Sequence, residues 1–282
     1  MTAVAGLPAL LAGCSGVLDP AGPVGRAELL IMLNAVVVML AIVVPVILAT
    51  LAVAWWFRAS NTRAKYRPDW EYSGRIELVV WSIPLMVVLA LGGVGWIGAH
   101  DLDPKKPIPS ASKPLEVQVV SLDWKWLFIY PEQRVAAVNQ LVIPAGVPVR
   151  FHITSATVMN SFFVPRLGSQ IYAMAGMVTQ LHLQADQPGV YDGLSAQYSG
   201  AGFSRMGFKV TAAPPAQFAS WVAATQASGP TLDAAEYTDL ANPSVGDPPS
   251  AYRQVDDGLF EEIVRRSAPG AMATTKPSPA ES

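Results

Sequence analysis

Residues 29–57 read LLIMLNAVVVMLAIVVPVILATLAVAWWF, a run in which Asn34 is the only clearly polar side chain. A helix that crosses the hydrocarbon core of a bilayer needs about 20 apolar residues, so this run is long enough to span a membrane. Pro45 does not forbid the helix, because neighbouring helices and local adjustments can satisfy the carbonyl groups that it leaves free. A second apolar run, at residues 77–99, contains Pro84 and is also long enough. The sequence therefore predicts two membrane-spanning helices.

The composition points to the same class of protein. Of the 282 residues, 51% are hydrophobic and 14% are charged, whereas soluble chains usually carry about 25% charged residues. Two buried helices of a soluble protein are the alternative, but no later segment is apolar enough to bury both. The net charge of −2 argues against nucleic-acid binding, which needs a concentrated basic surface. A single cysteine, Cys14, excludes a disulfide framework and any site that needs two thiolates from this chain.

The loop between the two runs, residues 58–76, decides the expected orientation. Its basic side chains outnumber its acidic ones, so the positive-inside rule places it in the cytoplasm. Residues 14–28 and everything after residue 99 then lie outside, which in a Gram-negative cell is the periplasm, and the inner membrane is the expected location. The basic residues of the loop are Arg58, Arg63, Lys65, Arg67 and Arg75, and the acidic ones are Asp69 and Glu71. Tryptophans cluster near the ends of the runs, as in an aromatic belt: Trp55, Trp56, Trp70, Trp81 and Trp96.

The N-terminus has the pattern of a lipoprotein signal. Leu11-Ala12-Gly13-Cys14 reads as a lipobox, which predicts a signal peptide at residues 1–13 and lipidation of Cys14. A signal peptide normally begins with a basic region, but no lysine or arginine precedes Cys14, so either the true start lies upstream or the signal is unusual. A cysteine that follows apolar residues by chance is the alternative.

After a linker at residues 100–113 the pattern changes to short β-rich stretches separated by turn residues. Such spacing predicts a β-sandwich or barrel, here at residues 114–212. The expected strands are residues 115–121, 125–130, 140–143, 147–154, 178–183 and 206–211. Helical patterns at 216–226 and 258–266 predict a C-terminal arm at residues 213–266, and the Ala/Pro/Thr/Ser-rich residues 267–282 predict a disordered tail.

Several blocks carry a resemblance to a known family. They are Glu77-Leu-Val-Val-Trp81-Ser-Ile-Pro84, Ser121-Leu-Asp-Trp124-Lys-Trp126-Leu-Phe-Ile-Tyr130, the block from Val158 to Met174, and the block from Tyr191 to Met206. These blocks resemble subunit II of the haem–copper respiratory oxidases, and most closely the bo-type ubiquinol oxidases. The resemblance implies an α+β membrane protein, with an N-terminal two-helix transmembrane hairpin, a periplasmic cupredoxin-like β-sandwich and a short helical C-terminal arm. The arm would carry the aromatic residues Phe218, Trp221, Tyr237, Tyr252 and Phe260.

The resemblance also decides which branch of the family is expected. In the cytochrome c oxidase branch the β domain holds a dinuclear copper centre, whose ligands include two bridging cysteines and two histidines. Soft thiolate and imidazole donors hold such copper, and hydroxyls, an amide and one thioether cannot replace them. The ligand positions map here onto Asn160, Ser195, Gln197, Ser199, Phe203 and Met206. We therefore expect no copper in this domain, and no blue-copper site either, because the only thiol is Cys14.

The other candidate residues have simpler interpretations. Strand alternation places His152 and His182 on the surface, and His100, at the end of the second span, is expected to be structural. A metal site built from His152, His182 and Met206 stays open, although the spacing of these residues does not support it. Trp124 and Trp126 match aromatic positions near the electron entry route of the copper branch, but packing is the expected role here.

The resemblance implies a non-catalytic subunit of a proton-translocating ubiquinol oxidase. Electrons would enter from ubiquinol at subunit I, which would hold the haems and the single copper, so this chain would bind no cofactor. Its partners would be subunit I, further small membrane subunits, the lipid bilayer and, through the complex, ubiquinol. Glu77 would lie near a proton-uptake path, unless it only faces water or pairs with Arg75. A cytochrome c oxidase subunit II and a membrane-anchored cupredoxin-fold scaffold or binding lipoprotein are the alternatives.

Overall fold

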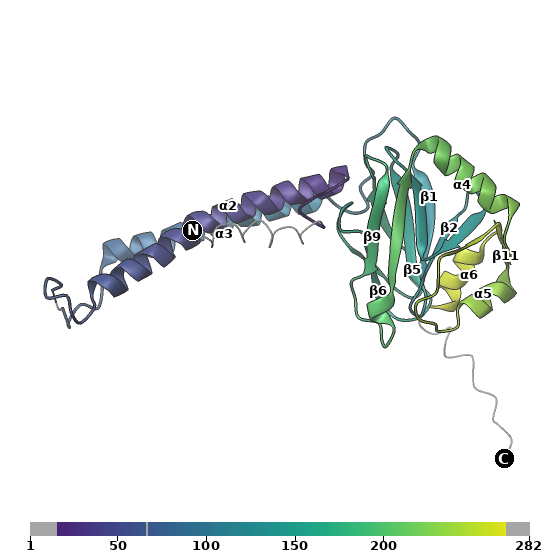
Figure 1. The fold of residues 1–282 in the computed structure, drawn as a ribbon. Coiled ribbons are helices and arrows are strands. Elements are labelled where there is room, and N and C mark those ends of the chain that lie inside the picture. Colours follow the sequence, from purple (N-terminus) through teal and green to yellow (C-terminus); the bar gives the residue numbers. More distant parts are fainter. Residues whose placement is uncertain (1–15, 66, 269–282) are drawn as a thin grey trace, which may run out of the picture. The chain divides into compact units, whose positions relative to one another are not determined.

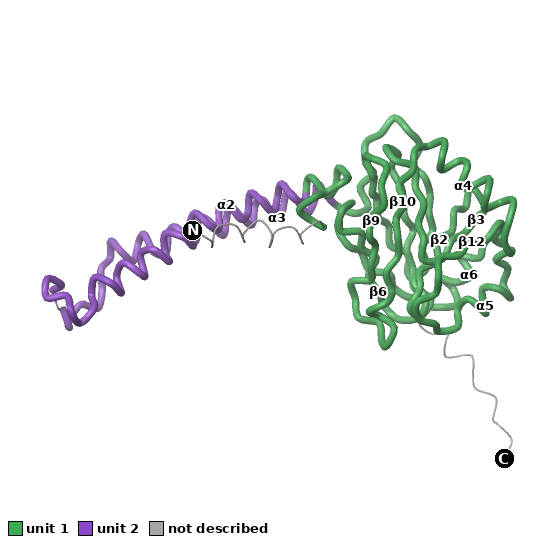
Figure 2. The backbone as a smooth tube through the Cα atoms, viewed as in Figure 1, with its two compact units in different colours: residues 1–27, 103–282 green, residues 28–102 purple. Residues whose placement is uncertain are grey.

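The computed structural model describes residues 16–65 and 67–268 of the chain. The chain divides into two compact units, residues 28–102 and the remainder (Figure 2). Residues 28–102 are helical, and the other unit is a β-sandwich to which short C-terminal helices are added (Figure 1). The fold class predicted from the sequence is therefore confirmed.

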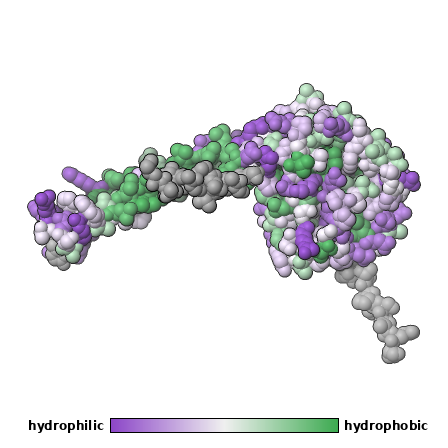
Figure 3. Space-filling model, in the orientation of Figure 1, coloured by the Kyte–Doolittle hydropathy of each residue, from purple (hydrophilic) through white to green (hydrophobic). Residues whose placement is uncertain are grey.

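The two long helices are α2 (Pro23–Trp56) and α3 (Gly74–Asp101). With 34 residues, α2 is about 51 Å long, which exceeds the roughly 30 Å of a bilayer core. Helix α2 begins six residues before the predicted run because Pro23 suits a first helical position and the first turn needs no apolar side chains. Both helices are long and apolar enough to cross a membrane, and their most apolar stretches have no buried residues. Figure 3 shows the hydrophobic surface along them.

The glycines of α3 differ in how closely other residues approach them. A Cβ added at Gly98 would lie 2.7 Å from Cδ1 of Ile31, so this glycine lets α2 and α3 approach closely. Within the described part of the chain, a Cβ at Gly92, Gly93 or Gly95 would have no atom within 4 Å.

The β domain consists of two packed sheets. The six-stranded sheet has the order β12-β3-β2-β1-β5-β8, and the five-stranded sheet has the order β4-β10-β9-β6-β7. The strands are β1 (Leu115–Ser121), β2 (Trp126–Tyr130), β3 (Val135–Val138), β4 (Gln140–Pro144), β5 (Val149–Ser155), β6 (Asn160–Phe163), β7 (Ile171–Ala173), β8 (Thr179–Leu183), β9 (Gly189–Ser195), β10 (Gly207–Ala213) and β12 (Ser250–Tyr252). A separate pair is formed by β11 (Thr231–Leu232) and β13 (Gln254–Val255).

The core between the sheets is rich in aromatic rings. Trp126, Phe128 and Phe162 are fully buried there, and the rings of Phe162 and Phe208 stack with centroids 5.2 Å apart. In β5 the alternation predicted from the sequence holds, because Phe151 and every second residue around it belong to this core.

The later part of the arm covers the outer face of the six-stranded sheet, while its first helix contacts the edge strands of both sheets. The arm contains α4 (Pro215–Ala227), α5 (Ala234–Leu240) and α6 (Leu259–Arg266), which lie on one side of the sandwich in Figure 1. The arm residues Tyr237, Tyr252 and Phe260 form a second core with Leu127 and Ile129 of β2. The other two aromatic residues predicted for the arm, on α4, pack against the first core instead: Phe218 and Trp221.

The residues just before α2 and the first turn of that helix contact the β domain. Ala21 donates its N–H to the carbonyl oxygen of Arg166 at 2.7 Å, and Gly25 donates to that of Leu167 at 3.1 Å. In return, Asp186 donates its N–H to the carbonyl oxygen of Ala21 at 2.9 Å. Two ion pairs, Arg166 with Asp19 and Arg26 with Asp186, join the same surfaces. We call residues 19–26 the N-terminal strap.

Candidate functional site

Four of the six predicted ligand positions meet at one end of the sandwich. Asn160 begins β6, Ser195 ends β9, and Met206 directly precedes β10. Asn160 Nδ2 donates to Met206 Sδ at 3.0 Å and to Ser199 Oγ at 3.3 Å. Asn160 Oδ1 accepts the N–H of Ser161 at 2.9 Å and also accepts the Ser195 hydroxyl. We call Asn160, Ser195, Ser199 and Met206 the polar cluster.

The remaining two positions contribute less. Gln197 takes part through its backbone, because its carbonyl oxygen lies 3.3 Å from Ser195 Oγ. Phe203, in the short 3₁₀ turn at Phe203–Arg205, does not join the cluster. Its ring instead packs edge-on against Tyr198, with the centroids 5.6 Å apart.

The chemistry of this donor set does not fit a dinuclear copper centre. The cluster offers two hydroxyls, one amide and one thioether, and these groups already hydrogen-bond to one another. Copper of this kind needs thiolate and imidazole donors. Among the described residues, no group of three or more His, Cys, Asp or Glu side chains is placed to hold a metal ion. We therefore derive no electron-transfer step through this domain.

Two tryptophans support the loop that carries the polar cluster. Trp126 is fully buried in the core, and its Nε1 donates to the carbonyl oxygen of Met206 at 3.3 Å. Trp124 has a positive φ of 72°, and its Nε1 donates to the carbonyl oxygen of Ser199 at 3.0 Å. A Cβ added at Gly202 would lie 2.4 Å from Cδ2 of Trp124. Both tryptophans therefore pack, as predicted, and both also hold the backbone of the loop.

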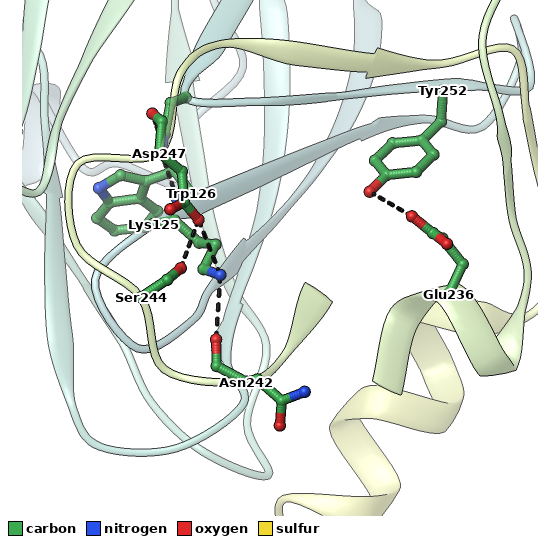
Figure 4. A network of polar contacts seen from close by, with 8 residues as sticks. Lys125, Trp126, Glu236, Asn242, Ser244, Asp247 and Tyr252 are labelled. Atoms are coloured by element: carbon green, nitrogen blue, oxygen red, sulfur yellow. Dashed lines mark hydrogen bonds and ion pairs between the residues drawn. The ribbon is translucent and has the colours of Figure 1, made fainter. Parts of the chain in front are cut away.

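A buried lysine between these tryptophans was not predicted from the sequence. Lys125 is only 3% exposed, and its Nζ lies 2.9 Å from Asp247 Oδ2 and donates to the carbonyl oxygen of Asn242 at 3.1 Å. The Ser244 hydroxyl also donates to Asp247. The hydroxyl of Ser244 and the ammonium of Lys125 together hold the pKa of the Asp247 carboxyl below its ordinary value. Figure 4 shows this network.

One of the two histidines predicted on the surface of the β domain is buried. His152 is half-buried and lies 3.0 Å from Glu116 through Nε2, whereas His182, predicted on the surface, is only 4% exposed. His182 is buried because it lies between Arg150, whose Nε donates to its Nε2 at 3.2 Å, and Pro104, whose carbonyl oxygen is 3.0 Å from its Nδ1. Strand alternation gives the correct face, but it does not reveal that the linker covers that face. Neither histidine lies with Met206, which belongs to the inter-sheet core.

Two other residues predicted from the sequence belong to α3, and a third lies outside the described residues. Glu77 lies in the first turn of α3 and accepts the indole N–H of Trp81 at 3.0 Å. His100, in the last turn of the same helix, packs against Trp96 with the rings tilted by 38° and their centroids 4.4 Å apart. Cys14 lies outside the described residues, as does most of the predicted tail, from residue 269 onward.

Comparison with known proteins agrees with the geometry. Residues 116–213 match the family model of the periplasmic domain of cytochrome c oxidase subunit II. Residues 226–269 match the model of an aromatic-rich motif found in these oxidases. The second match lies within the arm predicted at residues 213–266, apart from its last three residues.

Relatives of the whole chain are also known. The chain is 50% identical to the cytochrome bo(3) ubiquinol oxidase subunit 2 of Pseudomonas aeruginosa, over 91% of this chain and 78% of that one. It is 50% identical to the ubiquinol oxidase subunit 2 of Acetobacter aceti, over 91% and 84%. It is 37% identical to the quinol oxidase subunit 2 of Bacillus cereus, over 83% and 82%. The chain therefore belongs to the ubiquinol oxidase subunit 2 family, the quinol branch of subunit II of the haem–copper respiratory oxidases.

Proposed function

We propose that this chain is the non-catalytic subunit II of a proton-translocating oxidase that passes electrons from ubiquinol to oxygen at the end of an aerobic respiratory chain. The observation that carries the proposal is the polar cluster. Where the copper branch needs two thiolates and two imidazoles, this domain has an amide, two hydroxyls and a thioether that bond to one another. A domain without a redox metal has no means of receiving an electron from a cytochrome c. Its role is therefore to support the assembly of the complex and to cover subunit I.

The proposal places the chemistry in other subunits. Subunit I would hold the haems and the copper and would oxidise ubiquinol, while this chain would bind no cofactor of its own. Its long helices suit a partner inside the membrane, because the glycines at 92, 93 and 95 leave open a small-residue surface of the kind that closely packed membrane helices use. Further small membrane subunits and the lipid bilayer would complete the surroundings.

The same proposal assigns roles to two residues near the membrane. We infer an inner-membrane location with the β domain in the periplasm, and lipidation of Cys14 after removal of residues 1–13. Glu77 would lie at the cytoplasmic end of the second span, near the entry of a proton-uptake path. A carboxylate at that position is costly unless it is paired or functional, and its hydrogen bond from Trp81 holds it in one orientation.

The decisive experiment recovers the complex through a tag on this chain in mild detergent. Oxygen uptake is then measured with a ubiquinol analogue and, separately, with reduced cytochrome c. We expect uptake with the quinol alone, together with haem in the recovered complex. Uptake driven by cytochrome c, or recovery of the chain without a haem-bearing partner, would contradict the proposal.

A variant tests the role of Glu77. We expect Glu77→Gln to assemble normally and to slow turnover of the quinol, because the amide keeps the hydrogen bond from Trp81 but cannot carry a proton. Glu71→Gln, in the loop that precedes α3, serves as the matched control and should turn over like the unaltered complex. Normal turnover in an assembled Glu77→Gln complex would exclude the proton-entry role.

A further inference from the structure

The segment between α5 and β12, residues 242–247, contacts the β domain at the turn that precedes β2. Lys125 is the centre of this contact, because its Nζ binds both the Asp247 carboxylate and the Asn242 carbonyl oxygen, at 2.9 and 3.1 Å. Ser244 adds a backbone bond from its N–H to the carbonyl oxygen of Asp123 at 3.3 Å. The arm is thereby attached to the turn that precedes β2, and Figure 4 shows the contacts of Lys125 with Asn242 and Asp247.

Asn139 provides a second connection to the same turn. Its Nδ2 donates to the carbonyl oxygen of Asp247 at 3.0 Å, and its Oδ1 accepts the N–H of Trp126 at 2.9 Å. Asn139 has a positive φ of 56°, a conformation that asparagine tolerates better than most residues. One side chain thus joins the arm segment to the first residue of β2.

Trp124 and Trp126 connect this turn to the loop that contains most of the polar cluster. Their indole N–H groups hold the carbonyl oxygens of Ser199 and Met206, at 3.0 and 3.3 Å. The arm segment also approaches the loop directly, since a Cβ at Gly246 would lie 4.0 Å from Cδ of Arg205. A continuous set of contacts therefore runs from residues 242–247 to residues 195–206.

Apart from the hydrogen bonds of the polar cluster and of its own short turns, the loop at residues 195–206 has few side chains that can pack. It reads SAQYSGAGFSRM, so most of its side chains are too small to pack, and its glycines increase the conformational freedom that folding must remove. A metal bound to several of its positions would cross-link it, but the donor set present here does not suit one. We expect contacts with the rest of the domain to add to the polar cluster in holding the loop in one conformation.

We propose that residues 242–247 of the arm act as a brace for the loop at residues 195–206, through Lys125, Asn139 and the two tryptophans. The brace explains why a lysine is buried at this position. A buried ammonium costs free energy unless it is well paired, and this one is paired solely with the arm segment in the contacts of the described chain. The role assigned to the arm goes beyond the proposed function and does not depend on the identity of the electron donor.

Amide hydrogen exchange on the intact, detergent-solubilised complex tests the brace. In Lys125→Met we expect exchange in residues 195–206 and 242–247 to accelerate by about tenfold or more. Exchange in β5 and β8, which β1 separates from β2 in the six-stranded sheet, should stay unchanged. Lys209→Met is the matched control, because it removes an exposed lysine that pairs with Asp192, and it should leave residues 195–206 unaffected.

Two results would overturn the proposal. The first is faster exchange confined to residues 242–247, which would show that the arm is attached but braces nothing. The second is uniformly faster exchange across both sheets, which would mark a general loss of stability. Should Lys125→Met fail to assemble, Asp247→Asn gives the same test in a milder form, since the amide oxygen can still accept from Ser244 and Lys125. Donor preference in oxygen uptake is measured independently, so failure of the brace and failure of the proposed function give different results.

Discussion

Replacement of Asn160 by leucine tests whether the polar cluster fixes this end of the sandwich. Asn160 is 1% exposed, and leucine has the same branched arrangement of side-chain heavy atoms with more bulk, so the change removes hydrogen bonds and opens no cavity. The buried N–H of Ser161 loses the acceptor that lies 2.9 Å away, which costs about 1–3 kcal/mol. The Ser195 hydroxyl keeps a partner, because the carbonyl oxygen of Gln197 lies 3.3 Å from it. With the weaker contact to the Met206 sulfur included, we expect a loss of about 2–3 kcal/mol.

Hydrogen exchange on the intact complex measures this loss locally. A loss of about 2–3 kcal/mol corresponds to roughly 30- to 150-fold faster exchange in the peptides that cover Ser161 and Ser195, if they open without global unfolding. Ser199→Ala is the control, because its hydroxyl makes only long contacts of 3.3 and 3.9 Å, and it should change exchange by about threefold or less. Protection in Asn160→Leu equal to that of the unaltered chain would refute the reasoning, as would an equally large effect of Ser199→Ala.

Three further predictions concern the loop, the arm and the strap. Gly202→Ala should displace the indole of Trp124, because the added Cβ would lie 2.4 Å from the ring; faster proteolysis at residues 198–205 would reveal this, and unchanged cleavage would contradict it. Burial raises the pKa of Tyr237 to about 12, and burial together with Glu236 raises that of Tyr252 to about 12. The stability that these neutral phenols contribute should be fully present below their ordinary pKa of 10.0 and should be lost as the pH rises towards 12. In that range α5 and α6 should lose protection from hydrogen exchange before β5 does. Gly22→Ala should release the N-terminal strap, since its Cβ would lie 2.1 Å from the carbonyl oxygen of Gln184, and cleavage by protease between residues 16 and 27 should increase while the sheets stay resistant.

Strands with a clear pattern were predictable from the sequence, and irregular ones were not. Residues 115–121 coincide with β1, and the predicted segment 178–183 differs from β8 by one residue. Strands β6 and β9 escaped prediction because one has only four residues, NSFF, and the other, GVYDGLS, contains two glycines and an aspartate. Glycine and aspartate are rare in strands, and here long-range pairing with β10 imposes the strand conformation on β9.

The candidate site shows the same division. The ligand positions could be named from the sequence because the family motif fixes their order along the chain, and four of them meet in the polar cluster. The partner of Lys125 could not be named, because Asp247 lies more than a hundred residues later in an irregular segment with no periodic signal. Burial of His182 was missed for a related reason, since Pro104 belongs to a linker whose docking leaves no pattern in the sequence.

Burial of β2 on both faces explains why the arm is integral to the domain. The strand WLFIY has no polar residue apart from its tyrosine, and all five of its residues are buried. Trp126, Phe128 and Tyr130 face the inter-sheet core, while Leu127 and Ile129 face the second core, which the arm covers. A two-sheet sandwich normally leaves one face of each sheet to water and shows alternating polar residues there. Without the arm, these two side chains would lie exposed on a flat apolar strand of the kind that promotes aggregation. The apolar pattern of β2 therefore requires the aromatic residues of the arm, because only their packing removes Leu127 and Ile129 from water.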